Sequence, residues 1–171
     1  GRAFEQVRNS VGYPKLNVKI VGSHAGISVG EDGATHQCCE DIALMRTIPG
    51  MVILNPCDHY EMQAAVRAAV EHKGPCYIRL GRLAVESINN NDDYKFELGK
   101  GITLREGTDI TVVATGLMVQ EAVKAADALK EEGISVEVIN IHTIKPIDEE
   151  LVVASATKTK KVVTVEEHSV I

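Results

Sequence analysis

The amino-acid sequence predicts an α/β protein of two consecutive domains, each a mostly parallel β-sheet flanked by helices. Short, apolar, β-branched segments alternate with helical segments along the whole chain, which is typical of parallel sheets covered by helices. The 171 residues suffice for one large domain or two small ones. Residues 87–93 are polar and lack apolar periodicity, so we expect the domains to span residues 1–88 and 89–171.

The first domain is expected to hold three strands and three helices. Its strands are the short apolar runs at residues 16–21, 51–54 and 76–80. Apolar residues at helical spacing predict helices over residues 2–11 and 37–47. Asp58, with Glu61 three residues later, indicates the start of a third helix, and Gly74 indicates its end.

The second domain is expected to begin with a Gly-rich, hairpin-like stretch over residues 96–107. Its buried strands are predicted at residues 110–114, 136–141 and 162–165. The clearest helix of the chain has apolar residues at i, i+3 and i+4 from Val119 to Leu129, and Gly133 follows it as a cap. A further helix is expected over residues 148–157. Because three strands make a narrow sheet, we expect this domain to continue beyond the given residues.

Composition excludes several classes of function. Acidic residues outnumber basic ones by 24 to 18, and a net charge of −6 disfavours nucleic acid as the main partner. No run approaches the roughly 20 apolar residues of a membrane-spanning helix, and the start of the chain lacks a secretion signal. We therefore expect a cytoplasmic protein whose four cysteines are reduced and mostly buried.

Both ends of the chain fall inside patterned segments. The first predicted helix is already under way at residue 2, and the last strand runs into a loop without a cap. We therefore expect a section of a longer polypeptide or assembly, truncated at both ends.

The stretch with the most chemistry is the Gly-rich loop, defined here as residues 22–37. It carries two histidines, two acids and three hydroxyl side chains between a predicted strand and a predicted helix, the place where open α/β sheets bind ligands. Such a set can grip a polyhydroxylated substrate and move protons. A merely polar surface loop is the alternative, because glycine-rich loops are weak signals by themselves.

Several motifs together resemble the transketolase family. In the first domain these are Ser-His-Ala-Gly from residue 23, Gly-Glu-Asp-Gly-Ala-Thr-His-Gln from residue 30, and Arg-Leu-Gly-Arg from residue 79. In the second they are Thr-Ile-Lys-Pro-Ile-Asp from residue 143 and Val-Thr-Val-Glu-Glu-His from residue 163. The resemblance covers the chain from end to end. It identifies the halves as part of a pyrimidine-binding domain and part of a transketolase C-terminal domain.

The resemblance implies thiamine diphosphate chemistry: transfer of a two-carbon ketol unit between sugar phosphates, as in the pentose phosphate pathway. By the matching motifs, His24 and His36 are catalytic residues. His36 lies near the cofactor, and His24 also binds substrate hydroxyls. Asp32 contacts a substrate hydroxyl, and Arg82, rather than Arg79, binds the terminal phosphate.

The same resemblance implies that the chain needs a partner. In the family, the glutamate that activates the cofactor and the aromatic ring that stacks on it lie upstream of the residue that is Gly1 here. The diphosphate domain, with the ligands of a magnesium or calcium ion, is also separate, so no metal ligand is expected in this chain. We therefore expect activity only with a diphosphate-binding section or subunit, in a homodimer or heterotetramer.

Three alternatives stay open. Deoxyxylulose phosphate synthase shares the domain order but usually has Ala-Asp-Gly where this chain has Glu31-Asp32-Gly33. The β subunit of 2-oxo-acid dehydrogenases shares the architecture but has a different histidine pattern. A non-catalytic interaction module has no chemical need to keep His24, His36, Asp32 and Arg82 together.

Overall fold

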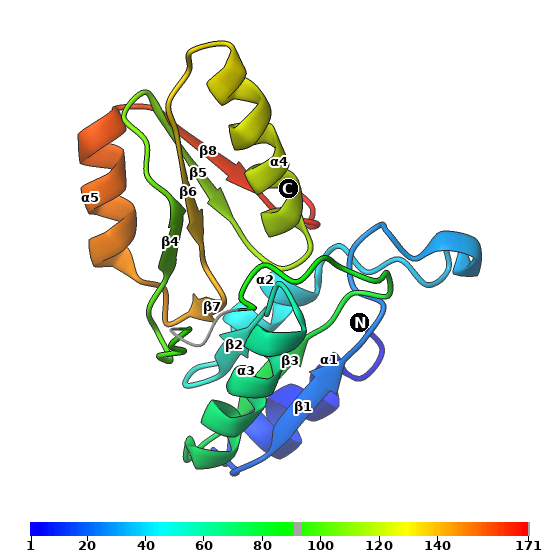
Figure 1. Cartoon of the computed structure of the whole chain (residues 1–171). Coiled ribbons are helices and arrows are strands. Elements are labelled where there is room, and N and C mark those ends of the chain that lie inside the picture. Colours follow the sequence, from blue (N-terminus) through cyan, green and yellow to red (C-terminus); the bar gives the residue numbers. More distant parts are fainter. Residues whose placement is uncertain (91–93, 171) are drawn as a thin grey trace.

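The computed structural model describes residues 1–90 and 94–170, which form two α/β lobes (Figure 1). Each lobe has a four-stranded, mostly parallel sheet flanked by helices, and this confirms the predicted fold class. The first half of the chain contains α1 (Phe4–Gln6), η1 (Val7–Gly12), β1 (Lys19–Gly22), η2 (Gly30–Asp32), α2 (Asp41–Arg46), β2 (Val52–Leu54), α3 (His59–Glu71) and β3 (Cys76–Arg79). The second half contains β4 (Ile102–Arg105), β5 (Ile110–Ala114), α4 (Met118–Glu131), β6 (Val136–Asn140), β7 (Thr143–Lys145), α5 (Glu149–Thr159) and β8 (Val162–Val165).

The first sheet takes one strand from the far half of the sequence. Its order is β1-β3-β2-β7, in which β1, β3 and β2 are parallel and β7 runs antiparallel to β2. Leu54 of β2 lies opposite Thr143 of β7. The sequence does not predict β7, because three residues are too short to show a period. The two halves therefore share a sheet.

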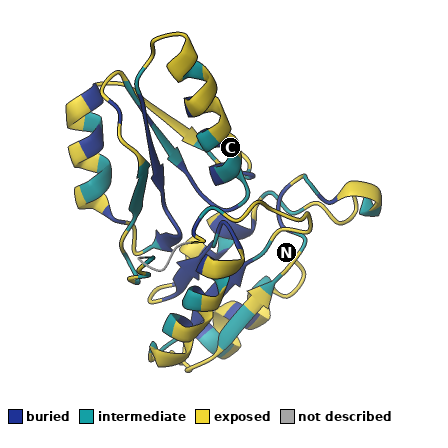
Figure 2. Ribbon diagram, in the orientation of Figure 1, coloured by how far each residue is buried: buried dark blue, intermediate teal, exposed yellow. Residues whose placement is uncertain are grey.

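The central strands of this first sheet, β2 and β3, are buried on both faces, as their apolar residues predict, whereas the edge strand β1 is half-buried to exposed (Figure 2). Successive strand residues point to opposite faces. Ile53 and Tyr77 therefore pack with α2 and η1, whereas Leu54 and Ile78 pack with α3. Asp58 starts α3 by accepting the backbone N–H of Glu61 at 2.8 Å, the predicted cap.

The second sheet has the order β4-β6-β5-β8, with β4 antiparallel to β6 and the other pairs parallel. Figure 1 shows α4 and α5 on its opposite faces. The predicted hairpin over residues 96–107 is wrong, because β4 pairs with β6 more than 30 residues later. Phe96 and Leu98 instead pack against the core of the first sheet, and the Gly99 N–H donates to Thr143 Oγ1 at 3.2 Å.

Smaller differences concern the ends of elements. The first helix becomes a π-helix from Val7 onward, and α2 begins at Asp41 rather than near residue 37. Cys38 is not helical because it forms an antiparallel bridge with Gly26. Of the four cysteines, Cys57 and Cys76 are buried, while Cys38 and Cys39 are half-buried, and all four are free thiols.

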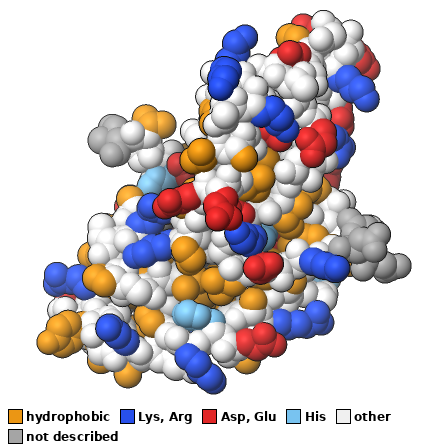
Figure 3. All heavy atoms as spheres, turned by 90° about the vertical axis from the view of Figure 1, so that its left-hand side faces the viewer, with side chains coloured by type: hydrophobic (Ala, Val, Ile, Leu, Met, Phe, Trp, Pro, Cys, Tyr) orange, Lys and Arg blue, Asp and Glu red, His pale blue; other side chains and the backbone are white. Residues whose placement is uncertain are grey.

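The outer surface carries no obvious segregation of charge on the face shown in Figure 3, where acidic and basic side chains are interspersed around apolar ones. Within residues 1–90 and 94–170, none of the helices is both long and apolar enough to cross a bilayer.

A buried histidine lies where the two halves meet. The ring of His142, just before β7, stacks on Phe96 with centroids 4.1 Å apart, and its Nδ1 lies 2.9 Å from Thr143 Oγ1. Its Nε2 is buried and has no hydrogen-bond partner among the described residues. Burial lowers the pKa of His142 to about 4, because the charged ring would be desolvated.

This histidine should make stability depend on pH. Between pH 6.5 and 4 the unfolded chain holds a proton on His142 that the folded chain lacks, so stability is lost as pH falls. His142 should contribute about 3 kcal/mol to this loss. The stability gap between the native chain and His142→Asn, measured by urea unfolding, should therefore narrow by about that amount from pH 7 to pH 4. A constant gap would contradict the assignment.

Candidate functional site

The predicted site residues lie where two parallel strands end side by side. β1 and β3 are neighbours, with Gly22 opposite Arg79, so the segments that follow them leave the same edge of the sheet. The Gly-rich loop follows β1, and Arg82 comes three residues after the end of β3. The Ala25 N–H donates to the Leu80 carbonyl at 3.1 Å, which joins the two segments.

Three of the four predicted residues are brought together. Arg82 donates through Nε to the Asp32 carboxylate, and His24 Nε2 lies 3.7 Å from the same carboxylate oxygen. Arg82 Nη2 also donates to Glu31 at 3.0 Å. His24, Asp32 and Arg82 are all partly open to solvent, so a ligand can reach them.

The backbone at His24 is unusual. Its φ of +62° lies in the left-handed region, which few residues other than glycine adopt. Such a strained backbone persists only where the surrounding fold holds it in place. It is found most often at functional sites. Ser23 Oγ lies 3.0 Å from His24 Nδ1 and orients the ring.

His36 stands apart from this cluster. Its ring is exposed, and its Nδ1 lies 3.1 Å from Thr35 Oγ1. No hydrogen bond joins it to His24, Asp32 or Arg82. The structure therefore places His36 on the same loop as the cluster, without a hydrogen bond or ion pair to it.

Arg79 is engaged in the interior. It donates to Asp41 through Nε at 2.8 Å and through Nη2 at 3.2 Å, and both side chains are buried. The Tyr77 hydroxyl donates to Asp41 as well, at 2.8 Å, and burial followed by the nearby Asp41 charge raises the pKa of Tyr77. Arg79 thus holds α2 against β3, whereas Arg82 is the arginine at the surface.

The cluster combines a proton-transfer group with one cation and two acids. An imidazole can give or take a proton, and a guanidinium matches the geometry of a phosphate. The Arg82–Glu31 pair is weak because Glu31 is almost fully exposed, so a phosphate can replace it. The sequence analysis did not predict Glu31 as a partner of Arg82. Its position next to Asp32 could have indicated that both acids lie near the same arginine.

The residues present fit the substrate side of a cofactor site better than a metal site. Within the described parts of the chain, no three His, Cys, Asp or Glu side chains gather in a way that could hold a metal ion. The half-buried ring of His24 and the exposed ring of His36 each use Nδ1 in a contact with the preceding hydroxyl, so Nε2 is the ring nitrogen available for a hydrogen bond to a ligand.

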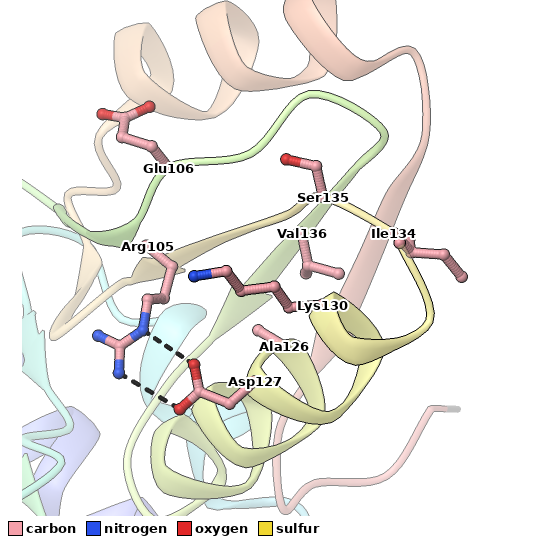
Figure 4. A pocket seen from close by; sticks show the side chains of 9 residues that line it. Arg105, Glu106, Ala126, Asp127, Lys130, Ile134, Ser135 and Val136 are labelled. Carbon is pink, nitrogen blue, oxygen red and sulfur yellow. Dashed lines mark hydrogen bonds and ion pairs between the residues drawn. The ribbon is translucent and has the colours of Figure 1, made fainter.

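Two hollows are lined by residues other than His24, Asp32, His36 and Arg82. One of about 330 Å³ lies beside α4 and the start of β6, where Lys130 points across it toward Arg105 (Figure 4). Arg105 is already paired with Asp127 at 3.2 Å, and the hollow contains none of the predicted site residues. Another, of about 390 Å³, lies between the lobes and is lined in part by Arg79, Leu117 and Glu167.

Two family models match the chain. The model of the transketolase pyrimidine binding domain matches residues 1–87, and that of the transketolase C-terminal domain matches residues 99–171.

Individual proteins match over nearly the whole chain. A Methanocaldococcus jannaschii protein described as a transketolase C-terminal section is 54% identical over 100% of this chain and 54% of its own length. A protein of Phocaeicola vulgatus, named as one of the subunits of an apulose-4-phosphate transketolase, is 44% identical over 98% of this chain and 54% of its own. A solved structure described as a split gene transketolase, an inactive beta4 tetramer, superposes with a TM-score of 0.91 at 51% identity, covering 100% of this chain and 55% of its own. The chain thus spans about half the length of these relatives.

The buried pair beneath the loop should matter for stability. Asp41→Asn keeps the shape of the side chain but leaves Arg79 as a buried cation without its counter-charge. We expect a loss of about 3 kcal/mol in the free energy of unfolding, measured with urea. Asp127→Asn, which breaks the exposed pair with Arg105, is the matched control and should cost less than about 1 kcal/mol. Equal losses would show that the burial of Arg79 and Asp41 is energetically unimportant.

Proposed function

Because the chain belongs to the transketolase family, we propose that it is the C-terminal section of a thiamine diphosphate-dependent transketolase. This enzyme transfers a two-carbon ketol unit from a ketose phosphate to an aldose phosphate, in the carbohydrate metabolism of the cytoplasm. The observation that carries the proposal is the cluster of His24, Asp32 and Arg82 at the carboxyl edge of the first sheet. It joins a proton-transfer group, a hydroxyl acceptor and an anion-binding group in one place.

The proposed roles follow from these side chains. Asp32 accepts a hydrogen bond from a hydroxyl of the sugar, and His24, whose Nε2 faces Asp32, donates to or accepts from an adjacent oxygen. Arg82 exchanges Glu31 for the terminal phosphate. His36, exposed on the same loop, moves a proton at the reacting oxygen.

When bound, thiamine diphosphate supplies the carbanion chemistry for breaking and making the carbon–carbon bond. The side chains of this chain that would face it are the imidazoles of His24 and His36. A magnesium or calcium ion would be held by residues of another section.

We further propose that this section works with a diphosphate-binding section or subunit, in a homodimer or heterotetramer. The family relatives named as subunits or sections support this view, as does the split gene relative described as an inactive beta4 tetramer. On this proposal, residues 1–171 alone are inactive.

The test is a ketol-transfer assay on the complete assembly with thiamine diphosphate and magnesium. One arm offers xylulose phosphate with an aldose phosphate, and the other offers pyruvate with glyceraldehyde phosphate. Transfer from the ketose alone would support the proposal. Turnover of pyruvate would instead indicate the reaction of a deoxyxylulose phosphate synthase or of a 2-oxo-acid dehydrogenase. If a cofactor-loaded assembly turned over neither pair of substrates, the chain would be a non-catalytic module.

Arg82 should govern the affinity for phosphorylated substrates. Arg82→Ala should raise KM for a sugar phosphate about 10- to 100-fold, because charge-assisted hydrogen bonds of about 1.5–3 kcal/mol are lost. Glu31→Gln removes a carboxylate that competes for Arg82, so its KM should stay the same or fall. An unchanged KM in Arg82→Ala would refute the phosphate assignment.

His36 should govern the chemical step instead. His36→Ala should lower kcat about 100-fold or more with a smaller change in KM, because proton transfer is lost while the phosphate contact remains. His59→Ala, on α3, is the control and should leave kcat unchanged. A full kcat in His36→Ala would remove His36 from the catalytic residues.

A further inference from the structure

The segment after β8 returns to the first lobe and holds the Gly-rich loop. We call residues 167–169 the C-terminal clamp. Glu167 Oε1 accepts the backbone N–H of Ser28 at 2.9 Å, inside the loop. The Ser169 N–H donates to the carbonyl of Cys39 at 2.8 Å, just beyond the end of the loop. The clamp therefore contacts the chain on both sides of Asp32 and His36.

The clamp is itself fixed by the buried ion pair. Arg79 Nη2 donates to the backbone carbonyl of Glu167 at 2.7 Å while the same guanidinium binds Asp41. Farther along, the Ala43 N–H donates to His168 Nε2 at 3.3 Å. One buried guanidinium thus joins β3, α2 and the C-terminal segment.

Glu167 packs closely against Gly26 of the loop. Glu167 is only 8% exposed, although a carboxylate normally stays in water. A side chain added at Gly26 would lie 2.7 Å from the Cβ of Glu167, so only glycine lets the loop approach so closely. Gly26 also has a φ of +83°. It exchanges two backbone hydrogen bonds with Cys38, and these join the two ends of the loop.

From this geometry we propose that Glu167 is a positioning residue for the site: its carboxylate sets the conformation of the loop that carries His24, Asp32 and His36. The second lobe then takes part in the site without a residue that touches the substrate. The effect on catalysis rests on the function proposed above, whereas the effect on the loop does not. Nothing in the motif resemblance assigned a role to this glutamate.

The effect on the loop can be measured without substrate. In the 171-residue chain, Glu167→Ala should speed hydrogen exchange of the Ser28 amide at least tenfold, because its acceptor is lost. Glu167→Gln keeps a side-chain oxygen and should stay within about threefold of the native rate. Glu166→Ala, at the exposed neighbouring position, is the matched control and should change nothing. Equal Ser28 rates in Glu167→Ala and Glu166→Ala would overturn the proposal.

A measurement on the unmodified chain covers the case in which Glu167→Ala does not fold. The Ser28 and Ser169 amides should then show similar protection from exchange, because both depend on the same clamp. A Ser28 amide that exchanges as fast as an unprotected one would overturn the proposal without any variant.

The effect on catalysis is measured in the complete assembly. Glu167→Ala should lower kcat at least tenfold with KM changed less than threefold, and Glu167→Gln should restore at least half of the native kcat. Activity that falls in step with the unfolding temperature in both variants would mean a structural role only and would contradict positioning. An inactive native assembly would refute the proposed function but leave the exchange results standing.

Discussion

The buried ion pair between Arg79 and Asp41 is the interaction on which the arrangement of the lobes and the site depends. A buried guanidinium is tolerated only when its donors are matched, and here the carboxylate of Asp41 and the carbonyl of Glu167 accept from it. Because these acceptors lie on α2 and on the segment after β8, the charge fixes two distant parts of the sequence against β3. Arg79 is thereby engaged in the interior, whereas Arg82 lies in the partly exposed cluster with Asp32 and Glu31.

A second set of contacts makes the two lobes one unit. β7 extends the first sheet, and Asn55, just after β2, bonds through its backbone N–H to the His142 carbonyl at 2.9 Å and through its side chain to Thr115 at 3.1 Å. Lys145 donates to the carbonyls of Arg46 and Ile48. The junction thus combines backbone pairing with the side chains of Asn55 and Lys145, and the two Lys145 bonds go to backbone carbonyls.

The sequence was sufficient to predict most helices and strands, but it did not predict how the two halves of the chain join. Strands such as Val52–Leu54 and helices such as α4 have apolar patterns that their burial requires, so they could be predicted. β7 is too short for a pattern, and β4 pairs with a strand far along the chain, a choice made by tertiary packing. For the site, motifs selected His24, Asp32, His36 and Arg82, and the contacts that place three of them together come from the structure. Glu167 could not be found, because its partner is a backbone N–H distant in sequence.

The shared sheet also limits how this section can be divided. A cut between the two family-model regions, somewhere in residues 88–98, would separate β2 from β7 and leave the backbone groups of β2 unpaired along an apolar edge. Edges of that kind recruit strands from other molecules and favour aggregation. Residues 1–87 produced without the second half would therefore leave this edge of β2 open to strands of other molecules.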